Sequence, residues 1–191
     1  LARHVHYAGA PKGASVPETA TERLARFVHE LDPAALPAAV RDQTTLCVLD
    51  ALGSALAGMS EPSGRASLAV ARAAGGRPEA SVFVHGDRLP AQAAALVNGT
   101  AAFSHNFTDT TLTCILHAGP VVVPTALAAG ELAGATGAEV LAAVVVGYEV
   151  MSRVGTAINA GAARMAHQKK GFHPTATCGV FGATAAASGC P

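Results

Sequence analysis

One stretch limits the possible folds more than any other, the apolar run from Ala138 to about Ile158. Thr136 and Glu139 open this run as a capping box, in which the two side chains satisfy each other's backbone N–H groups at a helix start. Valine, leucine and alanine then occupy nearly every side of the expected helix. Because a helix that is apolar nearly all round is buried, we expect residues 138–158 to form the buried central helix of a bundle.

The composition favours the same architecture. Half of the 191 residues are hydrophobic but only 4% are aromatic, and alanine dominates. Small side chains suit closely packed helices better than a β-sandwich, which is rich in valine, isoleucine and aromatic residues. The stretch ASVFVHGDRLP at residues 80–90 differs, because a β-branched and aromatic run precedes a Gly-Asp turn. We therefore predict an all-α helical bundle domain with one small β-hairpin near residues 80–90.

Apolar periodicity and helix breakers indicate the other helices. In the first helix, Leu24, Phe27, Val28 and Leu31 recur at helical spacing before Asp32-Pro33 ends the pattern. Further helices are expected from Pro37 to about Gly58, from Arg65 to Ala74, from Pro90 to about Ser104, from near Pro124 to Gly134, and after Pro174. Residues 60–64 are expected to be a loop, residues 1–17 a tail or arm, and residues 18–191 one domain.

Charge and cysteine patterns narrow the class of protein. The 13 basic and 13 acidic residues balance, and no basic patch indicates a nucleic-acid partner. The uncharged run at residues 110–130 contains a histidine, two prolines and many hydroxyl groups, so we expect no membrane span. The four cysteines lie in apolar segments without CxxC spacing, which is typical of free thiols in a reducing cytoplasm. We therefore expect a cytoplasmic protein.

Two segments contain most of the chemically versatile side chains. His117 lies in HAGPVVVP and His173 in GFHPT, each just before an expected helix start. A helix N-terminus offers free N–H groups and positive potential, which suit a carboxylate. Asp109, Thr110 and Lys170 add acidic, hydroxyl and cationic groups. Either the two histidines share one pocket, or each is a hydrogen-bonded structural residue far from the other.

Two other chemistries are less favoured. Neither segment has HxH, HxxxH or CxxC spacing, so we expect no metal site. Cys114 and Cys178 are better explained as small buried thiols than as nucleophiles.

Three segments resemble the MmgE/PrpD family, and they occur in the order ALVNGTAAFSHNFTDTT, HAGPVVVPTALAAGELAGATGAEVLAAVVVGYEV and GFHPTATCGVFGATAAA. The resemblance covers about residues 18–188. The family includes 2-methylcitrate dehydratase, cis-aconitate decarboxylase and iminodisuccinate epimerase. Its members are typically much longer, with a helical domain built from both ends of the chain, so the resemblance implies an incomplete helical domain here.

The resemblance also implies roles for individual residues. An acidic motif, commonly Asp-Phe-Asp-Asp-Thr, falls on residues 106–110, where asparagine replaces the first acid and threonine the third. The histidine of a His-Pro-Gly motif falls on His117, followed here by alanine, and a Phe-His-Pro motif is intact at residues 172–174. The implied catalytic residues are His117, His173, Asp109 and Thr110. The expected substrate-binding residues are Asn106, at the position of the first acid, and Lys170, the cationic group close to His173 in the sequence.

Similarity to this family implies a cofactor-independent lyase or isomerase that acts on a small di- or tricarboxylate. Acid–base groups would remove a proton next to a carboxylate, followed by dehydration, decarboxylation or epimerisation. The expected partners are the carboxylate substrate and either a second copy, as a homodimer, or a complementing chain. The alternative is a truncated, split or degenerate family member that acts as a noncatalytic binding or partner subunit, because the chain is short and Asn106 replaces an acid.

Overall fold

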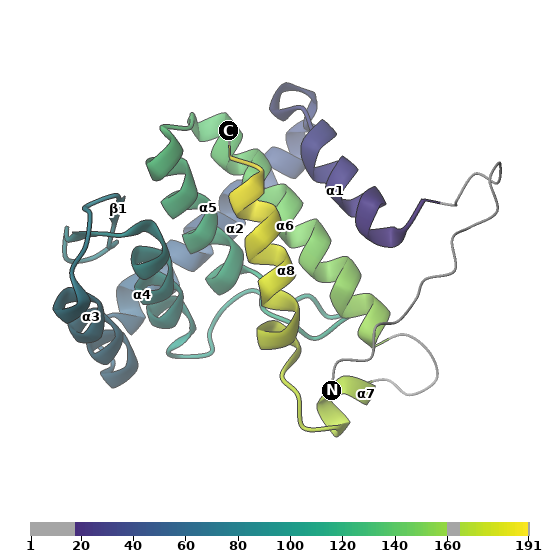
Figure 1. The fold of residues 1–191 in the computed structure, drawn as a ribbon. Helices are drawn as coiled ribbons and strands as arrows, with labels where there is room; N and C mark the ends of the chain where they lie inside the picture. The colour runs from purple at the N-terminus through teal and green to yellow at the C-terminus, as the bar shows by residue number, and fades with distance from the viewer. Residues whose placement is uncertain (1–17, 160–164, 191) are drawn as a thin grey trace, which may run out of the picture.

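A computed structural model describes residues 18–159 and 165–190, and Figure 1 shows their arrangement. The expected tail or arm at residues 1–17 lies outside this range. The helices are α1 (Ala20–Glu30), η1 (Pro33–Ala35), α2 (Ala38–Gly58), α3 (Pro62–Ala74), α4 (Ala91–Phe103), α5 (Gly119–Ala133), α6 (Gly137–Ile158), α7 (Ala166–Lys169) and α8 (Pro174–Ser188). Strands β1 (Ala80–Ser81) and β2 (Arg88–Leu89) pair antiparallel. The predicted mostly helical fold with one hairpin is confirmed.

Helix α6 is central, as the sequence indicates. Its capping box is formed: the Glu139 carboxylate accepts the Thr136 N–H at 2.7 Å, and the Thr136 hydroxyl accepts the Glu139 N–H at 3.3 Å. Helices α1, α2, α5 and α8 all pack against α6. Against α8 the backbones come close, because a Cβ on Gly147 would lie 3.1 Å from the Gly182 carbonyl oxygen. Glycine is therefore required where these two helices cross.

Among the described residues, α6 is the one helix whose length and hydropathy would suffice to cross a membrane. Here its apolar side chains pack on other helices, and Val144, Val146 and Met151 are buried. Its hydropathy is that of a core helix in this fold.

Two hydrophobic clusters form the core. The first joins α3, α4 and the hairpin, and the second joins α5, α6 and α8. Cys114 and Leu116, from the segment between α4 and α5, are fully buried in the second cluster. All four cysteines are free thiols, as expected, and Cys178 is also buried there. The segment between α4 and α5 is thus anchored in the core.

Two helix starts differ from the sequence-based expectation. Residues 60–64 are not wholly a loop, because α3 already begins at Pro62, whose fixed φ and missing N–H suit the first turn. Helix α5 begins at Gly119, so Pro124 lies inside it rather than near its start. Pro124 cannot donate to the Pro120 carbonyl, and that carbonyl lies against Gly99 of α4, where a Cβ would be only 2.6 Å away.

Candidate active site

The segment from His105 to Ala118 is a loop between α4 and α5, as expected. A tight turn fixes its second half, with the N–H of Thr111 donating to the carbonyl of Leu116 at 2.9 Å. At the end of α6, the Asn159 side-chain amide donates to the carbonyl of Cys114 at 3.0 Å. These contacts place the residues on either side of the turn next to each other.

The imidazole of His117 is held by its own loop. Its Nδ1 lies 3.0 Å from the carbonyl oxygen of Asp109, 3.2 Å from the Thr108 hydroxyl and 3.3 Å from the Thr110 hydroxyl. Since a carbonyl oxygen can only accept, Nδ1 carries the hydrogen. The neutral ring then keeps its lone pair on Nε2, which makes no hydrogen bond to any described residue. Nε2 is therefore the ring nitrogen of neutral His117 that can accept a proton.

The carboxyl group of Asp109 faces the start of α5. Its Oδ1 accepts the N–H of Gly119 at 3.0 Å, while its backbone N–H donates to Oδ2 of Asp50 on α2 at 3.2 Å. A Cβ on Gly119 would lie 2.4 Å from this Oδ1 and 3.0 Å from the Tyr148 hydroxyl. Asp109 therefore binds its loop to α5 through its carboxyl group and to α2 through its backbone N–H. Its contact with His117 is made by its backbone carbonyl.

Burial raises the pKa of Asp109, and the nearby charge of Asp50 acts in the same direction. The contacts with Gly119 and Tyr148 oppose this rise. Burial, and then the charge of Asp109, also raise the pKa of Tyr148. The Tyr148 hydroxyl is buried beside this carboxyl group, with no hydrogen bond of regular distance and angle to a described residue. Asp109 is thus a half-buried carboxyl group, enclosed on the side that faces Gly119 and Tyr148.

His173 occupies the N-cap position of α8, and its exposed ring makes no capping hydrogen bond. Two residues later, the Thr175 hydroxyl accepts the N–H of His117 at 3.0 Å. The Phe103 ring lies edge-on to both imidazoles, with centroid distances of 5.4 Å to His117 and 6.0 Å to His173. The two imidazole centroids therefore lie no farther apart than the sum of these distances. The structure brings the two histidines together around one phenylalanine.

A hollow of about 550 Å³ lies beside this pair, between α4, α5 and α8. His173, Thr175 and Phe103 line it, together with Thr100 and Thr125. His117 does not line it, although the ring of Phe103 touches both the hollow and His117. The space next to His173 is large enough for a small organic acid.

The two residues expected to bind substrate do not join this cluster. Asn106 is exposed and adopts a left-handed backbone conformation, with φ of 49°, which asparagine tolerates better than most residues. Its N–H donates to the carbonyl of Phe103. Lys170 follows the short helix α7, which the sequence did not predict, and its side chain is exposed. Neither side chain makes a hydrogen bond to His117 or His173 in the described structure.

Sequence reasoning missed four residues that hold the site together. They are Phe103, Thr175, Asp50 and Tyr148. Thr175 follows His173 so closely that the FHPT stretch could have suggested it. The other three come from α2, α4 and α6, and no local pattern marks them.

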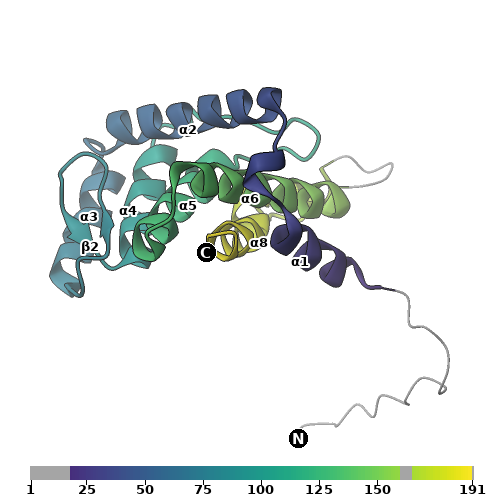
Figure 2. The ribbon, with the colours of Figure 1, turned by 90° about the horizontal axis from the view of Figure 1, so that it is seen from above.

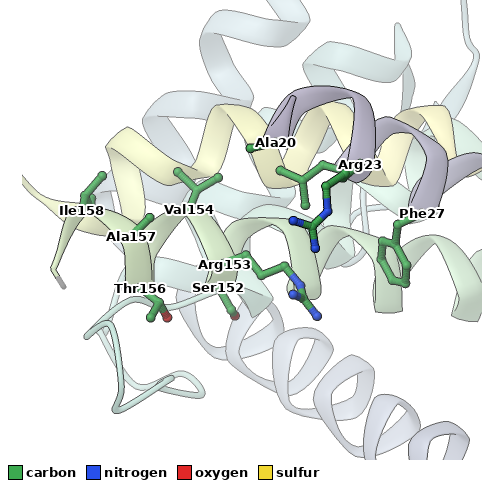
Figure 3. Close-up of a pocket in the computed structure, with 10 residues that line it drawn as sticks. Ala20, Arg23, Phe27, Ser152, Arg153, Val154, Thr156, Ala157 and Ile158 are labelled. Carbon is green, nitrogen blue, oxygen red and sulfur yellow. The ribbon is translucent and has the colours of Figure 1, made fainter. Parts of the chain in front are cut away.

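Another hollow, of about 740 Å³, lies between α1 and the C-terminal half of α6, as Figure 3 shows. Its lining is mainly apolar and includes Phe27 and Val154, with Arg23 and Arg153 among the polar side chains. None of the six candidate site residues lines it. Within residues 18–159 and 165–190, no three histidine, cysteine or acidic side chains gather as a metal site would require.

Comparison with known proteins identifies the family of this chain. The MmgE/PrpD N-terminal domain matches residues 22–190, and the chain belongs to the MmgE/PrpD family. It is similar to the cis-aconitate decarboxylase-like protein oryM of Aspergillus oryzae (strain ATCC 42149 / RIB 40), with 32% identity over 185 residues. The matched region covers 91% of this chain and 36% of the fungal protein, so the chain spans little more than a third of that relative.

Proposed function

We propose that this chain provides the acid–base groups of a cofactor-independent lyase or isomerase that acts on a small di- or tricarboxylate. One observation carries the proposal: His117 has Nδ1 bound to the Asp109 carbonyl, and both His117 and His173 lie against the ring of Phe103. Two imidazoles placed this closely can exchange a proton with one small substrate.

The surroundings of the histidines suit an anionic substrate. His173 lies at the N-terminus of α8, and Gly119, just after His117, begins α5. Both helix ends bring positive potential and N–H groups toward the site, although the Asp109 carboxyl group already occupies the Gly119 N–H. The hydroxyl groups of Thr110 and Thr175 lie in the same region. The start of α8, next to His173 and the hollow, is therefore the proposed carboxylate-binding position.

The similarity to a fungal cis-aconitate decarboxylase-like protein favours decarboxylation as the first reaction to test. In such a step, the carbon–carbon bond to one carboxylate breaks and carbon dioxide leaves. The electron pair stays on the substrate carbon, and a protonated imidazole supplies the proton that completes the product. Dehydration or epimerisation would use the same histidines to remove a proton beside a carboxylate.

The test is an assay of the purified protein with cis-aconitate, 2-methylcitrate and iminodisuccinate in D₂O. Proton NMR follows both product formation and deuterium exchange beside the carboxylates. We expect one substrate to react, and His117→Ala or His173→Ala to lower the rate at least about 100-fold. His85→Ala, in the hairpin turn, is the control and should keep the wild-type rate.

Conversion of none of the three acids would contradict the proposed activity. Calorimetric titration with the same acids would then test the noncatalytic binding role.

A further inference from the structure

The hollow between α4, α5 and α8, beside His173, is lined by three threonines. Figure 1 and Figure 2 both show α5 between the other two helices. Two of the threonines, Thr100 on α4 and Thr125 on α5, donate their O–H to a carbonyl of their own helix, at 2.7 Å in each case. Their hydroxyl groups are therefore not free to donate to a ligand.

Thr175, the third threonine, is different. It is 5% exposed, and its hydroxyl oxygen accepts the N–H of His117 at 3.0 Å. Because Thr175 is the second residue of α8, its O–H has no helical carbonyl one turn earlier, and no other described residue accepts it. Thr44, which is also buried, donates to the carbonyl of Val40 at 2.7 Å. A buried donor without an acceptor carries a free-energy cost, so the O–H of Thr175 indicates a polar group of a ligand in the hollow.

Two backbone N–H groups beside this hydroxyl also have no acceptor among the described residues. The first residue of α8 is a proline, which has no N–H, and the first bound N–H is that of Thr177, which donates to the His173 carbonyl. The N–H groups of Thr175 and Ala176 lie between them, and both residues line the hollow.

The charge of the hollow suits an anion. The N-terminus of α8 brings positive potential to it. Apart from His173, no residue that lines the hollow has an ionisable side chain, so no carboxylate of the lining competes for the free donors. The donors and the potential together fit a carboxylate.

We propose that Thr175 is a substrate-binding residue, whose O–H donates to one carboxylate of the substrate while the N–H of Ala176 donates to the other oxygen of that carboxylate. This inference rests on the proposed function, because it names the residue that holds the substrate beside His173. The Thr175 oxygen then makes two bonds at once, accepting the N–H of His117 and donating to the acid. A single side chain thereby fixes both the backbone of the proposed base and the position of the substrate.

The first test is calorimetric titration with tricarballylate, a saturated tricarboxylate with no group to eliminate. Thr175→Val keeps the size of the side chain but removes the O–H, and we expect the Kd to rise at least about tenfold. Thr175→Ser keeps the O–H and should retain most of the affinity. Thr125→Val is the matched control, because Thr125 lines the same hollow but donates to its own helix, and it should leave the Kd unchanged within about twofold.

Amide NMR separates binding of the acid from the contact of Thr175 with His117. In the wild type, we expect the N–H signals of Thr175 and Ala176 to shift saturably with added tricarballylate, with the Kd that calorimetry gives. Without acid, the N–H signal of His117 should move in Thr175→Val, which lacks the acceptor, and stay in Thr175→Ser. If the signals of Thr175 and Ala176 do not respond to the acid, Thr175 acts through His117 alone and the proposal fails.

These results are independent of the activity assay. Binding that depends on Thr175, in a chain that converts none of the three acids, would support this site and contradict the proposed reaction. Turnover and a Kd that are both unchanged in Thr175→Val would overturn the site and leave the proposed reaction standing. A wild-type chain that does not bind tricarballylate would also overturn the site.

Discussion

The carbonyl oxygen of Asp109 lies 3.0 Å from Nδ1 of His117, and this contact decides which ring nitrogen is free. A carbonyl requires a donor, so the neutral imidazole presents a bare Nε2. The side chain of Asp109 points elsewhere, to Gly119 at the start of α5. Sequence similarity implied a catalytic role for this aspartate, whereas the structure gives its carboxyl group the geometry of a positioning residue.

Nitrogen NMR of histidine-labelled protein should detect this arrangement directly. We expect neutral His117 to be in the Nδ1–H form, with the chemical shift of Nε2 typical of an unprotonated nitrogen. Thr110→Val should leave the tautomer unchanged, because the Asp109 carbonyl remains in place. A spectrum that shows hydrogen on Nε2 of neutral His117 would contradict the proposed base.

Phe103 is expected to matter more for activity than for stability. Phe103→Leu removes the edge contacts to both imidazoles while keeping an apolar side chain on a half-buried position. We expect a stability loss of about 1 kcal/mol in urea unfolding and a larger loss of turnover. The control is Phe181→Leu on α8, where the ring is 51% exposed and the change should be within about 0.5 kcal/mol. Equal turnover in both variants would show that Phe103 has no role in the candidate site.

The sequence predicted those parts of the fold that local patterns determine. The Thr136–Glu139 capping box and the apolar run after it located α6 to within a residue. The start of α5 was missed because a proline usually indicates the first turn of a helix, whereas Pro124 lies inside α5. The missing side chain of Gly99 on α4 leaves a gap for the Pro120 carbonyl, to which Pro124 cannot donate. That gap belongs to another helix, so no local pattern could have indicated it.

For the candidate site, the motifs selected His117 and His173 but not what connects them. Phe103 touches both rings, and Asp50 binds a backbone group 59 residues away in the sequence. Such contacts depend on how helices pack in space. Lys170 was expected from its position near His173 in the sequence, but that proximity did not bring its side chain to the cluster.

Gly119 and Gly137 provide a matched pair of substitutions at helix starts. Gly119→Ala would push a methyl group to 2.4 Å from Oδ1 of Asp109, so we expect a loss of about 1–3 kcal/mol and a displaced loop. Gly137→Ala meets no atom within 4 Å, and it should be neutral or stabilising by up to about 0.5 kcal/mol. Urea unfolding of both variants checks this. Similar stabilities for the two would show that Asp109 is not packed against α5.

The enclosed carboxyl group of Asp109 should also give stability a specific pH dependence. Its pKa is raised in the folded protein, first by burial and then by the charge of Asp50. The folded state therefore holds the proton more tightly than the unfolded chain does. The stability that this group contributes is fully present below its unfolded pKa, and it is lost as the pH rises through the folded value.

Asp109→Asn tests this sign, because the amide oxygen can still accept the N–H of Gly119 but carries no charge. Urea unfolding is measured for variant and wild type from about pH 3.5 to pH 7, the range in which carboxyl groups titrate. We expect the stability of the variant relative to wild type to increase with pH. Each unit of raised pKa would add at most about 1.4 kcal/mol, and less for a half-buried group.

Glu139→Gln is the control with the opposite sign. The backbone N–H of Thr136 and then its hydroxyl lower the pKa of Glu139, so the stability from this carboxylate is present above its unfolded pKa and is lost as the pH falls. The stability of Glu139→Gln relative to wild type should therefore decrease as the pH rises, while that of Asp109→Asn increases. If both differences changed in the same direction, a general effect of removing a negative charge would explain them, and Asp109 would not be an enclosed acid.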